Sequence, residues 1–405
     1  MAKVQYFPEE LQNIIPKNRI RSKLIDLISF ASDAGFYQLI PKAVVQPNSE
    51  EEIHNLFKFS QKNNIPLVFR TGGTSLSGQS ITDGILVDLS QNWNKIKVEA
   101  GGNLVRVQPG VTGALVNTYL KPYRRKIGPD PSSIQAAMIG GILSNNASGM
   151  CCGVKFNSYH TLKYIRFILP DGKTFSTEDP DDYLRFESEC SELAASLNHL
   201  REKIISNLPL YKKIREKYQT KNTIGYSLNS FIDYGHPLDI LAHSLIGAEG
   251  TLAFISEAVL ETIPDYPFKS TALLYFADIY AACQAIVPLT EAGAMMVEIM
   301  DRASLRAIEN IKGIPNFIKT LPDGAAALLV EFQEENLLQL EEKVNKFFSI
   351  SSKLSLIESP IFTTNPQEQA FLWKIRKGLF PAVGAVRASG TTVILEDIAF
   401  QVERL

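Results

Sequence analysis

The stretch Pro66-Leu-Val-Phe-Arg-Thr-Gly-Gly-Thr-Ser-Leu-Ser-Gly-Gln79 is the most informative part of the sequence. A short apolar run leads through an arginine into a loop of glycines and hydroxyl residues. Glycine lets backbone N–H groups approach a ligand closely, because it has no Cβ and tolerates positive φ. Successive N–H groups in such a turn form a concave anion site, and Thr and Ser hydroxyls add donors. The stretch therefore predicts a phosphate- or pyrophosphate-binding loop.

An ordinary Gly/Ser surface turn is the alternative reading of this loop, since its spacing matches neither GxGxxG nor GxxxxGK[ST]. The sequence before it favours a ligand site. Leu39–Val45 reads as a strand, and Ser49 with Glu52 forms a capping box for a helix over about 50–62. Pro66–Phe69 is then the next strand. The loop is expected at the carboxyl end of a strand in a β-α-β unit, where ligands commonly bind.

Two further glycine clusters follow along the chain. In the segment 128–149, Pro and Asp residues fix a turn, Ser132 or Ser133 can cap a short helix, and short polar side chains can bracket a heterocycle. In the segment 244–256, a glycine turn feeds an alternating strand. A loop rich in turn formers and a plain hairpin entry are the respective alternatives.

Taken together, the three clusters resemble the FAD-binding domain of the vanillyl-alcohol-oxidase superfamily. Within it they are most similar to the branch of D-lactate, glycolate and D-2-hydroxyglutarate dehydrogenases, and above all to large bacterial forms that carry a C-terminal iron–sulfur region. The resemblance covers about residues 30–265 and is weaker beyond. The motifs that carry it are 41–47, 70–79, 129–133, 140–149, 221–226 and 247–256.

This resemblance implies an α+β fold. A two-part FAD-binding domain of the p-cresol methylhydroxylase type is expected over 1–265, divided near residue 95, with an incomplete substrate cap over 266–405. The segment 177–220 is expected to be helical. In the cap, strands are predicted over 271–276, 294–301 and 325–332, and helices over 279–292, 302–309 and 335–349. The expected cofactor contacts are Arg70, Thr71, Gly72, Gly73, Thr74, Ser75, Leu76, Gly78, Gln79, Pro129, Asp130, Ser132, Ser133, Gly140, Gly141, Asn145, Ala147, Ser148, Glu249, Gly250 and Ile255.

The implied reaction is hydride transfer from a D-2-hydroxy acid to flavin N5, which gives a 2-oxo acid. A substrate carboxylate favours a bidentate arginine, and Arg376 matches the family's Trp-x-x-Arg context. A solvated helix charge is the alternative for Arg376. Glu396 and Asp397 are expected either to orient the substrate or to form a surface pair.

A histidine motif that supplies catalytic groups in the family does not occur before Leu405. The chain is therefore expected to be C-terminally truncated and weak or inactive alone, and the catalytic base is unassigned. The alternatives to a hydroxyacid dehydrogenase are another flavin reaction, such as an NADPH-dependent enolpyruvyl-sugar reductase, and a non-catalytic FAD-binding module. The expected electron acceptors are a quinone, a cytochrome or an attached iron–sulfur region.

Non-covalent FAD is expected, because Thr74 stands where histidyl-linked relatives carry histidine. A tether through Cys151 or Cys152 is the alternative, although inert thiols are favoured. The four cysteines lack CxxC spacing and no metal site is predicted, so a 4Fe-4S cluster belongs only to a region outside this chain. His236 and His243 are the nearest candidates for metal ligands and carry no ligand motif.

The composition of the 405 residues is typical of a soluble enzyme, with 45% hydrophobic and 21% charged residues. A formal net charge of −2 gives no reason to expect nucleic-acid binding. No apolar run is long enough for a membrane span, and the first residues lack the apolar core of a secretory signal. The expected location is the cytoplasm, with peripheral attachment to the inner membrane as the alternative, and no oligomeric state is predicted.

Overall fold

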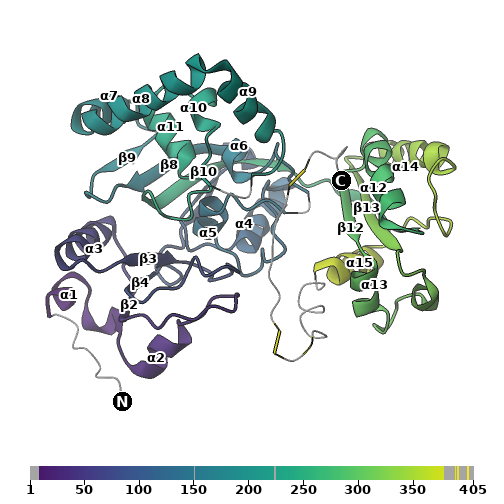
Figure 1. Ribbon diagram of the computed structural model, residues 1–405, viewed down its shortest axis with the longest axis horizontal. Coiled ribbons are helices and arrows are strands. Elements are labelled where there is room, and N and C mark those ends of the chain that lie inside the picture. Colours follow the sequence, from purple (N-terminus) through teal and green to yellow (C-terminus); the bar gives the residue numbers. More distant parts are fainter. Residues whose placement is uncertain are drawn as a thin grey trace. The chain divides into compact units, whose positions relative to one another are not determined.

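The computed structural model describes residues 9–149, 151–222 and 225–377, with short pieces at 388, 390–391 and 399–400. The chain forms two compact units, residues 1–264 and 265–405, each with its own core (Figure 1). Both units combine helices and strands, which confirms the expected α+β fold class. The candidate Glu396 and Asp397 lie outside the described residues.

The first sheet of unit 1 has the strand order β1-β2-β4-β3, with β2, β3 and β4 parallel. Its two faces are covered separately: α1 and α3 pack on the face of Val45 and Val87, and α2 packs on the face of Val44 and Leu86. The elements are α1 (Glu9–Ile14), η1 (Lys17–Arg19), β1 (Ile20–Arg21), α2 (Leu24–Ser29), β2 (Ala43–Val45), α3 (Glu50–Asn63), β3 (Leu67–Arg70) and β4 (Ile85–Asp88).

The helix expected after Ser49 is confirmed in detail. The Ser49 side chain accepts a hydrogen bond from the backbone N–H of Glu52, as an N-cap should. Asn64 ends α3 in the left-handed conformation, with φ of 49°. The following strand β3 leads directly into the predicted phosphate loop, so the loop does leave the carboxyl end of a parallel strand.

The second sheet of unit 1 is antiparallel, in the order β5-β6-β10-β8-β9, with β7 paired to β10. The helical segment expected over 177–220 is present as α7, α8 and α9, and it buries Phe186, Leu197 and Ile214 in the core of this sheet. The strands are β5 (Ile96–Glu99), β6 (Leu104–Val107), β7 (Arg125–Ile127), β8 (Leu162–Ile168), β9 (Thr174–Ser176) and β10 (Phe254–Pro264). The helices are η2 (Ala100–Gly102), α4 (Gly113–Leu120), η3 (Lys121–Tyr123), α5 (Ile139–Ser144), α6 (Ser158–Thr161), α7 (Pro180–Glu189), α8 (Ser191–Ser206), α9 (Leu208–Lys217), α10 (Ser230–Asp233) and α11 (Pro237–Ser244).

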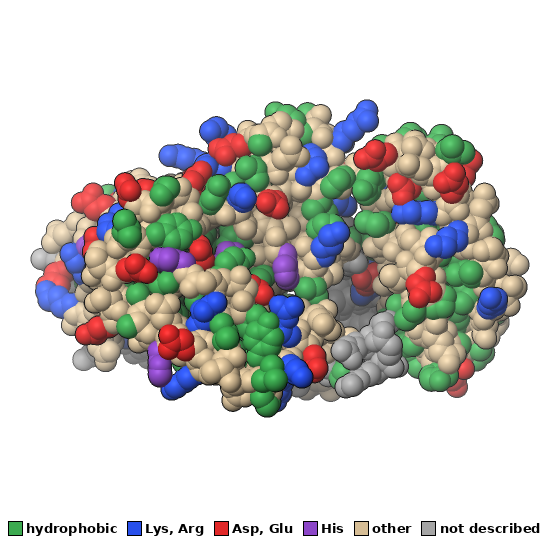
Figure 2. Space-filling view, turned by 90° about the horizontal axis from the view of Figure 1, so that it is seen from above, with side chains coloured by type: hydrophobic (Ala, Val, Ile, Leu, Met, Phe, Trp, Pro, Cys, Tyr) green, Lys and Arg blue, Asp and Glu red, His purple; other side chains and the backbone are tan. Residues whose placement is uncertain are grey.

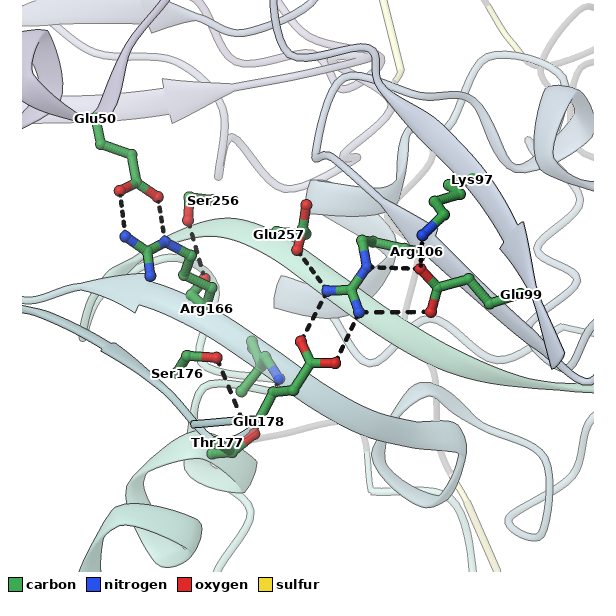
Figure 3. Close-up of polar contacts among 11 residues, drawn as sticks. Glu50, Lys97, Glu99, Arg106, Arg166, Ser176, Thr177, Glu178, Ser256 and Glu257 are labelled. Carbon is green, nitrogen blue, oxygen red and sulfur yellow. Dashed lines mark hydrogen bonds and ion pairs between the residues drawn. The ribbon is translucent and has the colours of Figure 1, made fainter. Parts of the chain in front are cut away.

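Two arginines cross-link elements of unit 1 that are far apart in sequence (Figure 3). Arg166 on β8 donates two hydrogen bonds of 2.8 Å to the carboxylate of Glu50 on α3, which joins the second sheet to the helix that covers the first. Arg106 on β6 contacts three carboxylates, those of Glu99, Glu178 and Glu257. Burial opposes ionisation of Glu50, but the hydrogen bonds from Arg166 outweigh it and lower the pKa of Glu50.

The Glu50 contact predicts an acid-sensitive part of the stability. A carboxyl whose pKa is lowered by folding stabilises the protein above its unfolded pKa, and this contribution is lost as the pH falls through the folded pKa. Glu50→Gln should therefore cost about 0.5–1 kcal/mol of unfolding free energy at pH 7 and less at pH 3.5. Urea unfolding at both pH values measures the difference. Glu51→Gln, at the exposed neighbouring position, is the control, and an equal cost at both pH values would contradict the assignment.

Unit 2 is a three-stranded antiparallel sheet in the order β11-β13-β12. Helices α12 and α14 cover one face, while α13 and α15 contribute to the core on the other. The six elements expected over 271–349 are confirmed, with bounds shifted by a few residues at most. They are β11 (Phe268–Phe276), α12 (Ile279–Glu291), β12 (Met296–Met300), α13 (Arg302–Ile308), β13 (Ala326–Glu334) and α14 (Leu337–Ser351); η4 (Asn316–Thr320) and α15 (Pro366–Lys377) complete the unit.

One face of the molecule carries charges of both signs. On the face shown in Figure 2, Lys and Arg side chains are interspersed with Asp and Glu side chains, and neither sign forms an extended field. A nucleic-acid interface would concentrate basic residues. Among the described helices, none has the length and apolar character needed to cross a bilayer.

Candidate functional site

The predicted phosphate loop runs from Arg70 to Gln79 and turns at two glycines with positive φ, Gly73 at +61° and Gly78 at +82°. A side chain at Gly73 would be strained for a second reason, since its Cβ would lie 2.5 Å from Nη2 of Arg70. The loop backbone therefore rests directly on the Arg70 guanidinium. Both positions need glycine for the turn itself.

Arg70 forms the floor of the loop. Its Nη1 donates to the carbonyl oxygens of Phe30 (3.2 Å) and Ser32 (2.8 Å), and its guanidinium lies 5.6 Å from the centre of the Phe30 ring. Burial lowers the pKa of Arg70, against the opposing charges of Asp33 and Asp88. These contacts fix the guanidinium beneath the loop, where it supplies positive charge to any anion held above.

The second half of the loop is braced by the segment 33–35, which the sequence did not single out. The Ser75 hydroxyl donates to Asp33 (2.7 Å), and the N–H of Ala34 donates to the carbonyl of Ser75 (3.0 Å). A Cβ on Gly35 would lie 2.3 Å from the carbonyl oxygen of Leu76. The Asp-Ala-Gly sequence, in which the Gly35 N–H donates to Asp33, is the signal that could have revealed this turn. At the end of the loop, the side chain of Gln79 accepts from the backbone of Ser77.

The first and second glycine clusters lie against each other, through residues that are more than sixty positions apart in sequence. A Cβ on Gly72 would lie 2.3 Å from the carbonyl oxygen of Ala136. From the same loop, the Thr71 side chain approaches the helix α5, 3.0 Å from a Cβ built on Gly140 and 3.3 Å from one built on Gly141. The clusters can meet this closely only because these positions carry no side chain.

The third cluster is joined to the second by hydrogen bonds. The Asn145 amide donates to the Glu249 carboxylate (2.7 Å), and the backbone N–H of Glu249 donates to Ser144 (2.7 Å). The N–H of Gly247 donates to Leu143 (3.0 Å). Asn146 and Glu249 both have positive φ, of 49° and 53°. Three motifs that are distant in sequence thus meet around α5, the first at Gly140 and Gly141 and the third at its C-terminal end.

Asp130 joins the turn of the second cluster to its end. Its backbone N–H donates to Ser148 (3.0 Å), and its carboxylate accepts from the N–H of Cys151 (3.2 Å). A Cβ on Gly149 would lie 2.1 Å from the Asp130 carbonyl oxygen. Burial raises the pKa of Asp130. Ser148 is buried (5% exposed), and its side chain lies beside the Cys152 thiol.

Other expected contacts have more modest surroundings. Ser132 and Ser133 lie in consecutive turns and do not cap a helix, because the next helix begins only at Ile139; that expectation was wrong. Ile255 is buried in β10 opposite Phe167. Near the convergence, the surface is lined by short or glycine residues that are exposed or half-buried, which are Thr71, Gly72, Gly73, Thr74, Gly141, Asn145, Ala147, Gly149 and Gly250.

This arrangement fits a phosphate-bearing cofactor. Glycines at 72, 140 and 149 keep the backbones in close contact, and the nearby hydroxyls and amides supply donors. Larger side chains at these positions would fill the space where the clusters meet. Among the described residues, no group of three or more His, Cys, Asp and Glu side chains could hold a metal ion.

In unit 2, Arg376 lies on α15 and is ion-paired with Glu298 of β12. Its Nε donates a hydrogen bond to one carboxylate oxygen (3.0 Å), and its Nη2 lies 2.7 Å from the same oxygen as an ion pair. The Arg376 side chain is 30% exposed, so it is neither a fully solvated helix charge nor a buried one. Nothing in the sequence drew attention to Glu298.

Two family models match the chain in succession. Residues 41–178 match the FAD binding domain, and residues 267–405 match the C-terminal domain of FAD linked oxidases. The chain therefore carries an FAD-binding domain and an FAD-linked oxidase C-terminal domain. FAD is the cofactor of such a domain, as expected from the sequence.

Curated relatives of the two domains are named for hydroxyacid oxidation. A D-2-hydroxyglutarate dehydrogenase of Pantoea ananatis is 29% identical over 79% of this chain, and the glycolate oxidase subunit GlcD of Bacillus subtilis is 26% identical over 89%. The chain spans about a third (32%) of the first relative's length and 65% of the second's.

Solved structures show the same fold. An alkyldihydroxyacetonephosphate synthase matches 95% of this chain and 65% of its own with a TM-score of 0.65 at 15% identity. A p-cresol methylhydroxylase matches 92% of this chain and 68% of its own with a TM-score of 0.61 at 13% identity. The fold of the p-cresol methylhydroxylase type, expected from the sequence, is confirmed.

We expect the FAD to be released when the protein is denatured. Thr74 offers no ring nitrogen for a covalent link, and burial raises the pKa of the Cys152 thiol to about 12, so its thiolate is scarce at neutral pH. Precipitation with trichloroacetic acid should leave flavin absorbance in the supernatant. Yellow precipitated peptide would contradict this, and mapping of Cys151 and Cys152 would then locate the link.

Proposed function

We propose that this chain is the flavin-bearing part of a dehydrogenase that oxidises a D-2-hydroxy acid of the lactate, glycolate or 2-hydroxyglutarate class to the 2-oxo acid. The single observation that carries the proposal is that three glycine clusters meet around α5, in a chain whose relatives are named for two of these acids. Unit 1 is proposed as the FAD domain and unit 2 as the substrate cap.

In this proposal, the loop residues 70–79 hold the pyrophosphate with backbone N–H groups, above the positive charge of Arg70. Asn145, Ser148 and Glu249 bracket the rest of the cofactor. Bound flavin supplies a hydride acceptor, which is the chemistry needed to oxidise a carbinol carbon. The short side chains of the second cluster leave room for a planar group, while the half-buried Asp130 holds the cluster's two ends together.

Arg376 is proposed to bind the substrate carboxylate. A carboxylate that leaves water must be paired, because an unpaired buried charge is strongly disfavoured. A guanidinium offers two parallel N–H donors, a geometry that an ammonium group lacks. The half-buried position of Arg376 supports this role, since its charge is partly withdrawn from solvent yet still reachable.

Anaerobic reduction of the bound flavin tests the proposal. The purified chain, loaded with FAD, is mixed with D-lactate, glycolate or D-2-hydroxyglutarate while the flavin absorbance is followed. Slow bleaching by at least one of these acids is expected, because the chain is expected to be weak alone and its catalytic base is unassigned, and the L-enantiomers of the chiral acids are the controls. Bleaching by NADPH and by none of the acids would contradict the proposal and favour a reductase on the same fold. An electron acceptor, whether a quinone, a cytochrome or an iron–sulfur protein, can then be identified by reoxidation.

A further inference from the structure

Two carboxylates lie on the face of the unit 2 sheet that packs against α15. Glu331 on β13 is paired with Met296, and Glu298 on β12 is paired with Leu329, so both side chains project from the same face. The surrounding residues on this face form an apolar core that includes Ile375 of α15. A carboxylate against an apolar core needs a hydrogen-bond donor or a cation as its partner, and each of the two has such a partner on α15.

Glu331 is the buried member of the pair. Its side chain accepts hydrogen bonds from Trp373 Nε1 (2.5 Å), Thr271 Oγ1 (2.7 Å) and Gln333 Nε2 (2.6 Å), and the residue is 2% exposed. These donors satisfy the carboxylate inside the protein and anchor α15 to the sheet. Trp373 precedes Arg376 by three residues, so the anchor fixes the same helical face from which the arginine projects.

Glu298 holds the arginine itself. One of its oxygens accepts a hydrogen bond from Nε of Arg376 and forms an ion pair with Nη2, and these two nitrogens lie along one edge of the guanidinium. The opposite edge, formed by Nη1 and the second N–H of Nη2, has no hydrogen-bond partner among the described residues. A guanidinium held by one edge can still bind a carboxylate bidentately along the other.

We propose that Glu298 is a positioning residue that orients Arg376, so that the Nη1 edge of the guanidinium faces the carboxylate of the substrate. The inference rests on the proposed function, because it needs an anionic substrate at Arg376. Its effect must be geometric, since the negative charge of Glu298 weakens the attraction between Arg376 and an anion. Removing the charge while keeping the hydrogen-bond acceptor should therefore preserve binding, and removing the acceptor should not.

Three variants separate these effects. Glu298→Gln keeps an acceptor oxygen without the charge, and Glu298→Leu removes both at similar volume. Glu334→Gln is the matched control, because Glu334 has nearly the same side-chain exposure (17% against 16%) in the same unit but pairs with Lys343. Each FAD-loaded protein is titrated with oxalate by calorimetry, since oxalate is a dicarboxylate without a transferable hydride. The flavin content, Tm and anaerobic reduction by the three acids are measured in parallel.

Glu298→Leu should weaken oxalate binding at least about tenfold. It should lower the second-order rate constant for flavin reduction by the acids by the same factor. Glu298→Gln should stay within about threefold of the wild type, and Glu334→Gln should match it. Equal oxalate affinity in Glu298→Leu and the wild type would overturn the inference, as would equal losses in both Glu298 variants. A wild type that binds oxalate but is reduced by none of the acids would contradict the proposed function alone. Failure of the wild type to bind oxalate would overturn the inference.

Discussion

Replacing Gly72 with alanine is expected to strip most of the FAD from the protein. The added methyl group would lie 2.3 Å from the Ala136 carbonyl oxygen, and backbone on the second cluster cannot swing aside as a flexible side chain would. Overpacking of this kind costs roughly 1–3 kcal/mol. This cost should destabilise the FAD-bound form, so FAD affinity should drop about 10- to 100-fold. The ratio of flavin to protein absorbance after gel filtration measures the loss.

Gly235→Ala is the matched control for this variant. Gly235 is exposed, its φ is not positive, and no atom lies within 4 Å of a Cβ built there. It should keep its flavin and its Tm. A folded Gly72→Ala protein with wild-type FAD affinity would show that the contact between the two clusters is not needed for the cofactor. Thermal unfolding of apo forms distinguishes a lost cofactor from a lost fold.

Arg376→Ala should lower the efficiency of substrate oxidation by about 100-fold or more, because it removes a charge-assisted bidentate contact of a few kcal/mol. Arg376→Lys keeps the charge without the fork and should fall between the wild type and the alanine variant. The FAD content should be unchanged in both, since the cofactor loops belong to unit 1. Anaerobic flavin reduction over a range of substrate concentrations provides the measurement.

One complication of this experiment follows from the ion pair. Arg376→Ala leaves the half-buried Glu298 carboxylate without this cation, and the resulting repulsion of an anionic substrate adds to the loss. The double variant Arg376→Ala with Glu298→Gln removes that repulsion and isolates the missing contact. Normal oxidation of 2-hydroxy acids by either variant would show that Arg376 is only a solvated charge on a helix. It would also remove the main support for the proposed substrate class.

The sequence was most informative where local chemistry decides the structure. The Ser49 cap, the left-handed end of α3 at Asn64 and the strand into the loop follow from neighbouring residues, and all were predictable. The alternation of strands and helices in unit 2 could likewise be predicted, because the hydrophobic residues of each segment follow the period of a strand or of a helix. Within the candidate site, the glycine clusters were recognisable because close backbone approach demands glycine.

Long-range partners could not be predicted in the same way. Nothing local to Arg70 indicates that its guanidinium binds Phe30 and Ser32, and nothing local to Glu298 indicates Arg376, 78 positions away. Such pairs depend on register and on which faces meet, information that is distributed over whole elements. The serine-capped helix at 132–133 failed for a related reason: serine favours turns as well as caps, and here the turn prevailed.

The contacts beneath the phosphate loop also bear on where the cofactor domain begins. The family match starts at residue 41, yet the carbonyls that hold Arg70 and the carboxylate that holds Ser75 belong to residues 30–33. The family match therefore begins after the residues that support the loop. A fragment that began at residue 41 would keep every residue of the loop but would lack the residues that support it. Any minimal or transplanted version of this flavin module therefore has to include the segment upstream of residue 41.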